Sequence, residues 1–425
     1  MEENIYKGYI QILEEELLPA MGCTEPISLA YAAALARETL GNIPDKVNIV
    51  VSGNILKNVK SVIVPNSNGL KGVTAAASAG IIAGNASKKL QVLSEITEAQ
   101  KEEVKKYHEA TPFSVSKSNT GCVFDIHITV YKGLNSASVR IEGHHTNVIS
   151  VEKNGKPVLY EKEEYVAKKM QDRSILSVKG ILEFANTVKI DDIKQVIERQ
   201  IEYNTAIAEE GLTNDYGASV GKILLKSFGD SVFNKAKATA AAGSDARMNG
   251  CSLPVVIVSG SGNQGMTASL PVIVYAKHLG VSYETMLRAL VLSNLITIHL
   301  KTGIGRLSAY CGAVSAGAGA GAGVCYLYGG GYDWVAHTIV NALAIDSGII
   351  CDGAKSSCAA KIATAVESGL LGMEMYRNGS QFYGGDGILE RGVENTIDNV
   401  GILARKGMQS TDEEIINLMI KNLQK

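Results

Sequence analysis

The stretch SAYCGAVSAGAGAGAGVCYLY, residues 308–328, contains no charged side chain and is dominated by alanine and glycine. A second uncharged stretch, PVVIVSGSGNQGMTASLPVIVYA, covers residues 254–276. A membrane-spanning helix needs about 20 predominantly apolar residues, whereas both stretches are interrupted by Gly, Ser, Asn or Pro. We therefore interpret them as buried elements of a soluble protein and expect no membrane partner. Their small side chains favour closely packed helices and argue against a β-sandwich.

Strand signals are confined to the first part of the chain. KVNIVVSG at 46–53 and VKSVIVP at 59–65 are typical of strands, and KGVTAAASAGIIAG at 71–84 is typical of a helix of small residues. From residue 122 onward apolar and polar side chains alternate, as in a half-buried strand. The Asn154–Gly155 pair, flanked by β-branched residues, predicts a hairpin turn.

Helical periodicity takes over after about residue 175. Apolar residues recur at helical spacing at 4–18, and again in ILSVKGILEFANTV, IDDIKQVIERQIEYNTAIAEEG and SYETMLRALVLSNLITIHLKTG. The sequence therefore predicts an α+β fold, with an N-terminal mixed antiparallel sheet with helices and a C-terminal, mostly α-helical domain. We expect residues 1–175 to form the first domain and residues 176–425 the second.

The net charge and the N-terminal sequence limit which binding partners and which cellular compartment we expect. The net charge is −2 and no basic tract of five residues occurs, so we expect no nucleic-acid partner. The N-terminal residues are acidic where a signal peptide is basic, and the apolar core of such a peptide is missing. We expect a cytoplasmic protein, in a reducing compartment where disulfides are rare.

The cysteines are candidates for inert core residues, metal ligands or reactive thiolates. Their number, seven, is odd, which argues against a full set of disulfides. Cys122, Cys251 and Cys325 fit the first class, because free cysteine is among the most buried residue types.

Three other cysteines are candidates for a metal site. Cys351 and Cys358 flank a Gly-containing break just before a predicted helix, and a helix N-terminus lowers the pKa of a thiol. Their spacing matches neither a zinc ribbon nor a ferredoxin. Together with Cys311 they would give three thiolates without a fourth. That set suits an iron–sulfur cluster with one open iron, which could act as a Lewis acid toward a substrate.

The segment SGSGNQG, residues 259–265, is a candidate anion site. A loop rich in Gly and Ser offers backbone N–H groups to an anion, although a tight turn between buried elements is the alternative. It matches neither the phosphate loop nor the dinucleotide fingerprint. Amide side chains in so apolar a setting favour carboxylate binding. The candidate substrate-binding residues are Ser259, Ser261, Asn263 and Gln264, with Ser52 and Asn54 as a second group.

The segment GCTEP places Cys23 and Glu25 where a loop enters a helix. Cys23 fits an ordinary buried thiol or a reactive thiolate equally well. Glu25 has a favourable position for a carboxylate near a helix N-terminus. We interpret His144 and His145 as polar residues of a turn between two strands.

Taken together, GCTEP, SGSGNQG, CGAVSAGAGAGAG and ICDGAKSSCA resemble the L-cysteine desulfidase family, which is related to the α-chains of iron–sulfur L-serine dehydratases. The resemblance runs over essentially the whole chain, in order. It implies an oxygen-sensitive [4Fe–4S] enzyme that converts L-cysteine to pyruvate, ammonia and sulfide without pyridoxal phosphate. It also suggests a homodimer.

Matched motif by motif, the resemblance implies that Cys311, Cys351 and Cys358 hold the cluster. The interval between Cys351 and Cys358 is shorter here than the corresponding interval in the dehydratases. GCTEP occupies the place of the dehydratase SSSHT loop, which supplies catalytic groups. Cys23 is therefore expected to be the base that removes the α-proton, or else a fourth cluster ligand at rest. Glu25 would orient the substrate ammonium or tune the base, and the substrate sulfur would bind the open iron.

Three alternatives follow from the same residues. L-serine dehydration by the same machinery is the alternative enzyme. A non-catalytic iron–sulfur or thiol-based sensor of cysteine would use the same ligands without turnover. A zinc-stabilised structural protein is the third.

Overall fold

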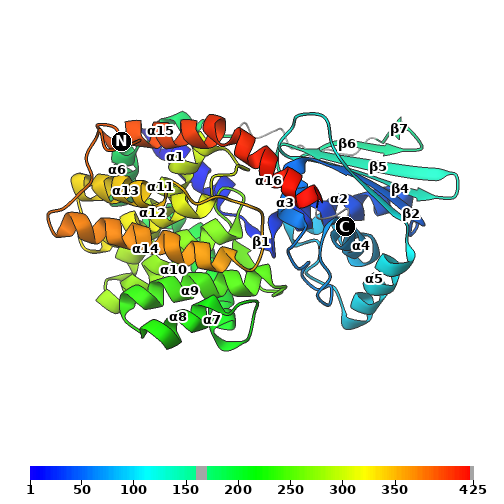
Figure 1. Ribbon diagram of the computed structural model, residues 1–425, viewed down its shortest axis with the longest axis horizontal. Coiled ribbons are helices and arrows are strands. Elements are labelled where there is room, and N and C mark those ends of the chain that lie inside the picture. Colours follow the sequence, from blue (N-terminus) through cyan, green and yellow to red (C-terminus); the bar gives the residue numbers. More distant parts are fainter. Residues whose placement is uncertain (159–169, 422–425) are drawn as a thin grey trace.

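The computed structural model describes residues 1–158 and 170–421, and it consists of a part built on a β-sheet and a larger helical part (Figure 1). The sheet part comes almost entirely from the first 158 residues, and helices dominate from residue 178 onward. This confirms the predicted α+β fold, with its N-terminal mixed sheet and mostly helical C-terminal region.

The sheet has six strands in the order β3-β2-β4-β5-β6-β7. Only β2 and β3 pair in parallel, and the other neighbours are antiparallel. Asn154 and Gly155 both have positive φ, 52° and 72°, as the tight turn between β6 and β7 requires, so the predicted hairpin is confirmed. The strands are β2 (Lys46–Val51), β3 (Phe113–Lys117), β4 (Asp125–Lys132), β5 (Asn135–Glu142), β6 (Val148–Lys153) and β7 (Lys156–Pro157).

One face of this sheet is covered by helix α2 (Thr24–Leu40), which begins directly after Cys23. Alternate residues of β4 and β5 are buried on that face, and Ile128 lies opposite Val139 in the register. α2 in turn packs on α4 (Val73–Ala83), the predicted helix of small residues. The sheet and α4 thus fix the direction in which the N-terminus of α2 points.

The prediction of a strand at 59–65 is wrong. Ser52 caps a helix immediately after β2, α3 (Gly53–Val59), so the following residues leave the sheet edge. Only Ile63 makes an isolated bridge, to Lys71. The apolar side chains of Val59, Val62 and Val64 are buried in the core instead, so tertiary packing overrides their preference for strands.

In the helical part, α10, α11, α13 and α14 pack directly on α12 (Figure 1). No helix in the described part of the chain is both long and apolar enough to cross a membrane. The other helices are α1 (Glu3–Glu16), α5 (Glu98–Ala110), α6 (Val178–Thr187), α7 (Ile190–Thr213), α8 (Val220–Phe228), α9 (Val232–Met248), α10 (Gly262–Leu279), α11 (Tyr283–Ile304), α12 (Gly312–Leu327), α13 (Tyr332–Asp346), α14 (Cys358–Arg377), α15 (Val393–Ile402) and α16 (Gln409–Lys421), with short helical turns at Ala86–Gln91, Arg173–Ile175 and Leu403–Gly407.

The Gly/Ala stretch explains how α12 and α14 pack. A Cβ on Gly317 would lie 2.1 Å from the Ala365 carbonyl oxygen, and one on Gly369 would lie 2.0 Å from the Gly317 carbonyl oxygen. The two backbones are therefore in direct contact, and any larger side chain would force them apart. This contact fixes Cys311, which precedes α12, relative to Cys358, which begins α14.

The two ends of the chain connect the sheet part and the helical part. β1 (Pro19–Met21) pairs antiparallel with β8 (Pro254–Val256), so the segment before α2 is joined to the helical part. At the other end, α16 packs on α3, beside the sheet (Figure 1). The division at residue 175 stays a prediction, and these crossings show that both parts contribute to one boundary region.

Candidate active site

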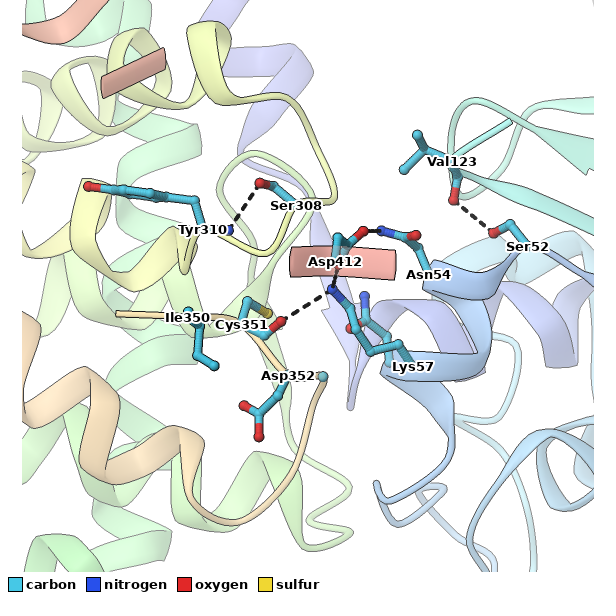
Figure 2. A network of polar contacts seen from close by, with 12 residues as sticks. Ser52, Asn54, Lys57, Val123, Ser308, Tyr310, Ile350, Cys351, Asp352 and Asp412 are labelled. Atoms are coloured by element: carbon cyan, nitrogen blue, oxygen red, sulfur yellow. Dashed lines mark hydrogen bonds and ion pairs between the residues drawn. The ribbon is translucent and has the colours of Figure 1, made fainter. Parts of the chain in front are cut away.

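Cys311 and Cys351 are brought together by a short antiparallel contact between segments 40 residues apart in the sequence. The Cys311 N–H donates to the Ile349 carbonyl at 3.1 Å, and the Cys351 N–H donates to the Ala309 carbonyl at 2.6 Å. Between them Tyr310 and Ile350 form an isolated bridge (Figure 2). Cys358 follows at the first position of α14, and all three thiols line the same cavity.

The three thiols are the type of donor that an iron–sulfur cluster takes. Within residues 1–158 and 170–421, no group of three His, Cys, Asp or Glu side chains converges closely enough to hold one metal ion. A structural zinc needs four converging ligands, whereas each thiolate of a four-iron cluster binds a different iron. The donor set of Cys311, Cys351 and Cys358 in one cavity therefore fits the cluster that the resemblance implies. The space in the cavity, its open mouth included, is about 850 Å³.

Burial raises the pKa of two of these thiols, those of Cys311 and Cys358. It raises the pKa of Cys311 to about 12, with the neighbouring Cys351 adding to the effect, and it raises the pKa of Cys358 in the same direction. The expected lowering by the helix N-terminus is therefore outweighed. Burial also lowers the pKa of Lys301 to about 8, opposed by Cys351 and Cys311 nearby. Binding of a metal centre would favour the thiolate over the protonated thiol, because thiolate is the form that binds metal.

The other cysteines outside GCTEP do not line this cavity. The Cys122 thiol donates to the Phe124 carbonyl at 3.1 Å, and Cys251 and Cys325 are buried. This placement agrees with the interpretation of Cys251 and Cys325 as inert core residues, whereas Cys122 is only partly buried and lies before β4, so its assignment to the core is wrong.

Cys23 and Glu25 reach the cavity from the N-terminus of α2. The Cys23 thiol donates to Glu25 Oε2 at 3.1 Å, and Asn58 Nδ2 donates to Glu25 Oε1 at 3.0 Å. Burial raises the pKa of Cys23 well above its usual value, and the adjacent Glu25 carboxylate raises it further. Cys23 also belongs to an apolar cluster that includes Met248 and Cys358. The structure thus places Cys23 beside a proton acceptor and in the same apolar packing group as Cys358, one of the three candidate metal ligands.

The SGSGNQG segment forms a tight turn and also lines the cavity. Val258 and Ser261 exchange backbone hydrogen bonds of 3.1 and 3.0 Å, with Ser259 and Gly260 between them at positive φ, 48° and 80°. The turn delivers the N-terminus of α10 to the cavity, where helix N–H groups favour anions. Ser259, Ser261, Asn263 and Gln264 all lie in the lining.

Ser52 and Asn54 do not line the cavity, which corrects their assignment as substrate-binding residues. The Ser52 hydroxyl donates to the Val123 carbonyl at 2.7 Å and accepts from the Ile55 N–H at the start of α3. Asn54 Nδ2 donates to Asp412 Oδ2 at 2.7 Å (Figure 2). Both polar groups are thus used to fix α3, one against the sheet and the other against α16.

A buried ion pair connects the C-terminal helix to the cysteine loop (Figure 2). Lys57 Nζ lies 2.5 Å from Asp412 Oδ1 and donates to the Cys351 carbonyl at 3.2 Å. Its side chain is 1% exposed. The loop also packs tightly here, because a Cβ on Gly353 would lie 2.2 Å from the Lys57 carbonyl oxygen. The backbone of a candidate ligand is therefore supported by both ends of the chain.

Several cavity residues were missed by the sequence analysis: Asn58, His145, Arg247, Lys301, Arg306 and Lys361. His145 is in the predicted turn between strands, but it is buried and points into the protein rather than to solvent. Burial lowers its pKa to about 4. Arg247 offered one signal, as a cation near the end of an alanine-rich helical segment. The other residues show no local pattern.

Comparison with known proteins is consistent with this site. Residues 87–417 match the family model described as serine dehydratase alpha chain. A UPF0597 protein of Desulfitobacterium hafniense is 56% identical over 99% of this chain and 98% of its own length. UPF0597 proteins of Lachnoclostridium phytofermentans and Treponema denticola are 53% and 48% identical, over 98% and 99% of this chain and all of their own length. The chain therefore belongs to the serine dehydratase alpha chain family.

Proposed function

We propose that this protein is a lyase that eliminates sulfide from L-cysteine, releasing pyruvate and ammonia, with a [4Fe–4S] cluster held by Cys311, Cys351 and Cys358. The observation that carries the proposal is the single cavity that these three thiols share with Cys23 and Glu25. Membership of the serine dehydratase alpha chain family supports lyase chemistry and an iron–sulfur cofactor. It does not by itself choose between sulfur and oxygen as the leaving atom.

The charges in the cavity suit an anionic content. Among its described lining residues, four cations (Arg247, Lys301, Arg306 and Lys361) accompany one carboxylate, that of Glu25. Lys361 already pairs with Asp352, and Arg306 Nη2 lies 3.8 Å from Glu16 Oε1. Among the described residues, Arg247 and Lys301 have no such carboxylate and would balance bound thiolates and the carboxylate of an amino acid. When bound, the cluster supplies an iron without a protein thiolate, a Lewis acid that makes the substrate sulfur a better leaving group.

The removal of the α-proton is assigned to Cys23. Its S–H proton already lies on a hydrogen bond to Glu25 Oε2, so transfer of this proton to Glu25 generates a thiolate. Because burial and the Glu25 charge raise the pKa of Cys23, the thiolate is strongly basic once formed. The hydrogen bond from Asn58 keeps the Glu25 carboxylate in position for this transfer.

The elimination then balances without a further reactant. The α-proton moves to the Cys23 thiolate, the Cβ–S bond breaks, and the C–H electron pair forms the new carbon–carbon double bond. The departing HS⁻ takes the proton held by Glu25, which restores the starting state of both side chains. The aminoacrylate product tautomerises and hydrolyses to pyruvate and ammonia in water.

L-serine dehydration is the second candidate, because the matched family is described by that substrate. The presence of GCTEP where the dehydratases have SSSHT favours cysteine. The sulfur of a thiol substrate is also a softer ligand than a hydroxyl oxygen, and it therefore suits the open iron of a sulfide cluster better.

Product analysis after anaerobic cluster reconstitution tests the proposal. We expect L-cysteine to give sulfide and pyruvate in equal amounts, and Cys351→Ala to give neither. Cys325→Ala is the matched control, because Cys325 is buried within α12 away from the cavity, and it should retain wild-type rates. Binding of L-cysteine with no pyruvate released by the loaded protein would contradict the proposal and support the sensor.

A further inference from the structure

Arg247 is a buried cation with too few partners. It lies one residue before the end of α9, lines the cavity, and is 2% exposed, the largest of the fully buried side chains. Nη1 donates to Asn263 Oδ1 at 3.1 Å, and Nε has no hydrogen-bond partner. Among the described residues, no carboxylate lies within ion-pair distance of its guanidinium. A buried charge in this state is unfavourable unless a ligand completes its surroundings.

Its position distinguishes Arg247 from other arginines with an unpaired Nε. Arg37 and Arg199 share that feature, but both donate to backbone carbonyls and neither lines the cavity. Three other residues of the same lining also have a buried polar atom without a partner: Gln264 Oε1, His145 Nε2 and the Tyr310 hydroxyl. Four such groups at one cavity indicate a polar ligand rather than a packing defect.

The backbone of the SGSGNQG loop lies in close contact with the Arg247 side chain. A Cβ on Gly262 would lie 2.4 Å from Arg247 Nε, so SGSGNQG passes directly over the arginine. Asn263, which the sequence analysis assigned to the substrate, instead orients Arg247 through its Oδ1. The segment thus presents both the N-terminus of α10 and a fixed guanidinium to the cavity.

We propose that Arg247 binds the α-carboxylate of the amino-acid substrate, while Gln264 Oε1 accepts a hydrogen bond from its ammonium group. An arginine fork matches a carboxylate in geometry and charge, and an amide oxygen is a suitable acceptor for an ammonium. The assignment rests on the proposed function for the identity of the substrate. It extends that function by making a free α-amino acid, rather than a simple thiol, the molecule that this cavity selects.

Two small thiols test the assignment, because each carries only one of the two polar groups by which L-cysteine would be recognised, the carboxylate or the amine. 3-Mercaptopropionate has the carboxylate without the amine, and cysteamine has the amine without the carboxylate. Their dissociation constants for the reconstituted protein are measured by anaerobic calorimetry, which requires no turnover. We expect Arg247→Gln to weaken 3-mercaptopropionate about 10- to 100-fold, the usual worth of a hydrogen bond to a charged group, and to change cysteamine less than about twofold.

The controls separate recognition from folding. Arg199→Gln removes an arginine with an unpaired Nε outside the cavity and should leave both constants unchanged. Asn263→Ala keeps Arg247 but removes the hydrogen bond that orients its guanidinium. It should therefore also weaken the binding of 3-mercaptopropionate more than that of cysteamine, although by a smaller factor than Arg247→Gln. This variant provides the test if Arg247→Gln folds poorly. Unfolding in urea should show Arg247→Gln at least as stable as the wild type, because an unpaired buried charge is removed.

Equal weakening of both thiols, or no change in either, would overturn the assignment. That result would make Arg247 a general counter-charge for the cavity or a structural group. A protein that releases no sulfide from L-cysteine but shows the selective loss would retain the carboxylate site and contradict only the proposed reaction.

Discussion

The ion pair between Lys57 and Asp412 should control how firmly the cysteine loop holds its cluster. Asp412→Asn removes the negative charge next to Lys57, whose side chain is 1% exposed, against 16% for Asp412. Leaving one partner of a buried pair uncompensated costs about 3–5 kcal/mol. Asparagine keeps an oxygen that can still accept from Lys57, so we expect the lower part of that range, about 3 kcal/mol.

The consequence for the cluster follows from the second contact of Lys57. Its Nζ donates to the Cys351 carbonyl, so a displaced lysine leaves the ligand loop without that support. We expect the reconstituted Asp412→Asn protein to lose iron to a chelator at least about tenfold faster than the wild type, which corresponds to a barrier to iron release that is lower by about 1.4 kcal/mol. Urea unfolding measures the change in folding free energy, and absorbance of the cluster follows its loss.

A double-mutant cycle makes this test specific. Lys57→Met removes the buried charge itself, and the double variant with Asp412→Asn should be less destabilised than the sum of the single variants. Asn54→Ala, which removes only the neighbouring bond to Asp412, is the matched control and should release iron at close to the wild-type rate. Additive destabilisation, or iron loss at the wild-type rate in Asp412→Asn, would refute the reasoning.

Three further predictions concern the cysteines and one buried acid. Cys351→Ala should abolish cluster absorbance after reconstitution whereas Cys122→Ala keeps it, and full iron occupancy in Cys351→Ala would remove that residue from the ligand set. Cys23→Ser should retain cluster and substrate binding but slow exchange of the substrate α-proton with solvent deuterium at least about 100-fold, because a serine hydroxyl is a far weaker base; an altered resting spectrum with normal exchange would make Cys23 a cluster ligand instead. Burial raises the pKa of Asp245 to about 6, so the folded state binds this proton more tightly than the unfolded state, and its stabilising contribution is lost as pH rises through about 6. Asp245→Asn should therefore gain stability relative to the wild type as pH rises from 5 to 7.5, by about 1.4 kcal/mol of the roughly 3 kcal/mol that the whole pKa shift is worth, and a difference in urea unfolding that is independent of pH would contradict this.

The fold was predictable where periodicity and turn chemistry acted locally. The hairpin at Asn154–Gly155 needs two residues that tolerate positive φ, and the sequence provides them side by side. The segment 59–65 shows the limit, because its β-branched residues suit a strand and are nevertheless buried in an irregular connection after α3. The sequence contains the preference of those side chains but not the packing that overrides it.

The site was predictable only in part, for a similar reason. Cys311, Cys351 and Cys358 stood out through their Gly-rich surroundings and the motif resemblance, and the structure places them in one cavity. Arg247 and His145 come from a helix and a strand connection far apart in the sequence, and neither has a motif. Their role depends on what the fold brings together.

The relative efficiency toward L-cysteine and L-serine tests the central claim most directly. Both amino acids should be assayed anaerobically on one reconstituted preparation, with pyruvate as the common product, so that cluster content cancels in the ratio. The account predicts a kcat/KM for L-cysteine at least about tenfold higher than for L-serine, because on the proposed function the leaving sulfur would bind the open iron, which favours sulfur over oxygen. A kcat/KM that is higher for L-serine would contradict it and make the protein an L-serine dehydratase.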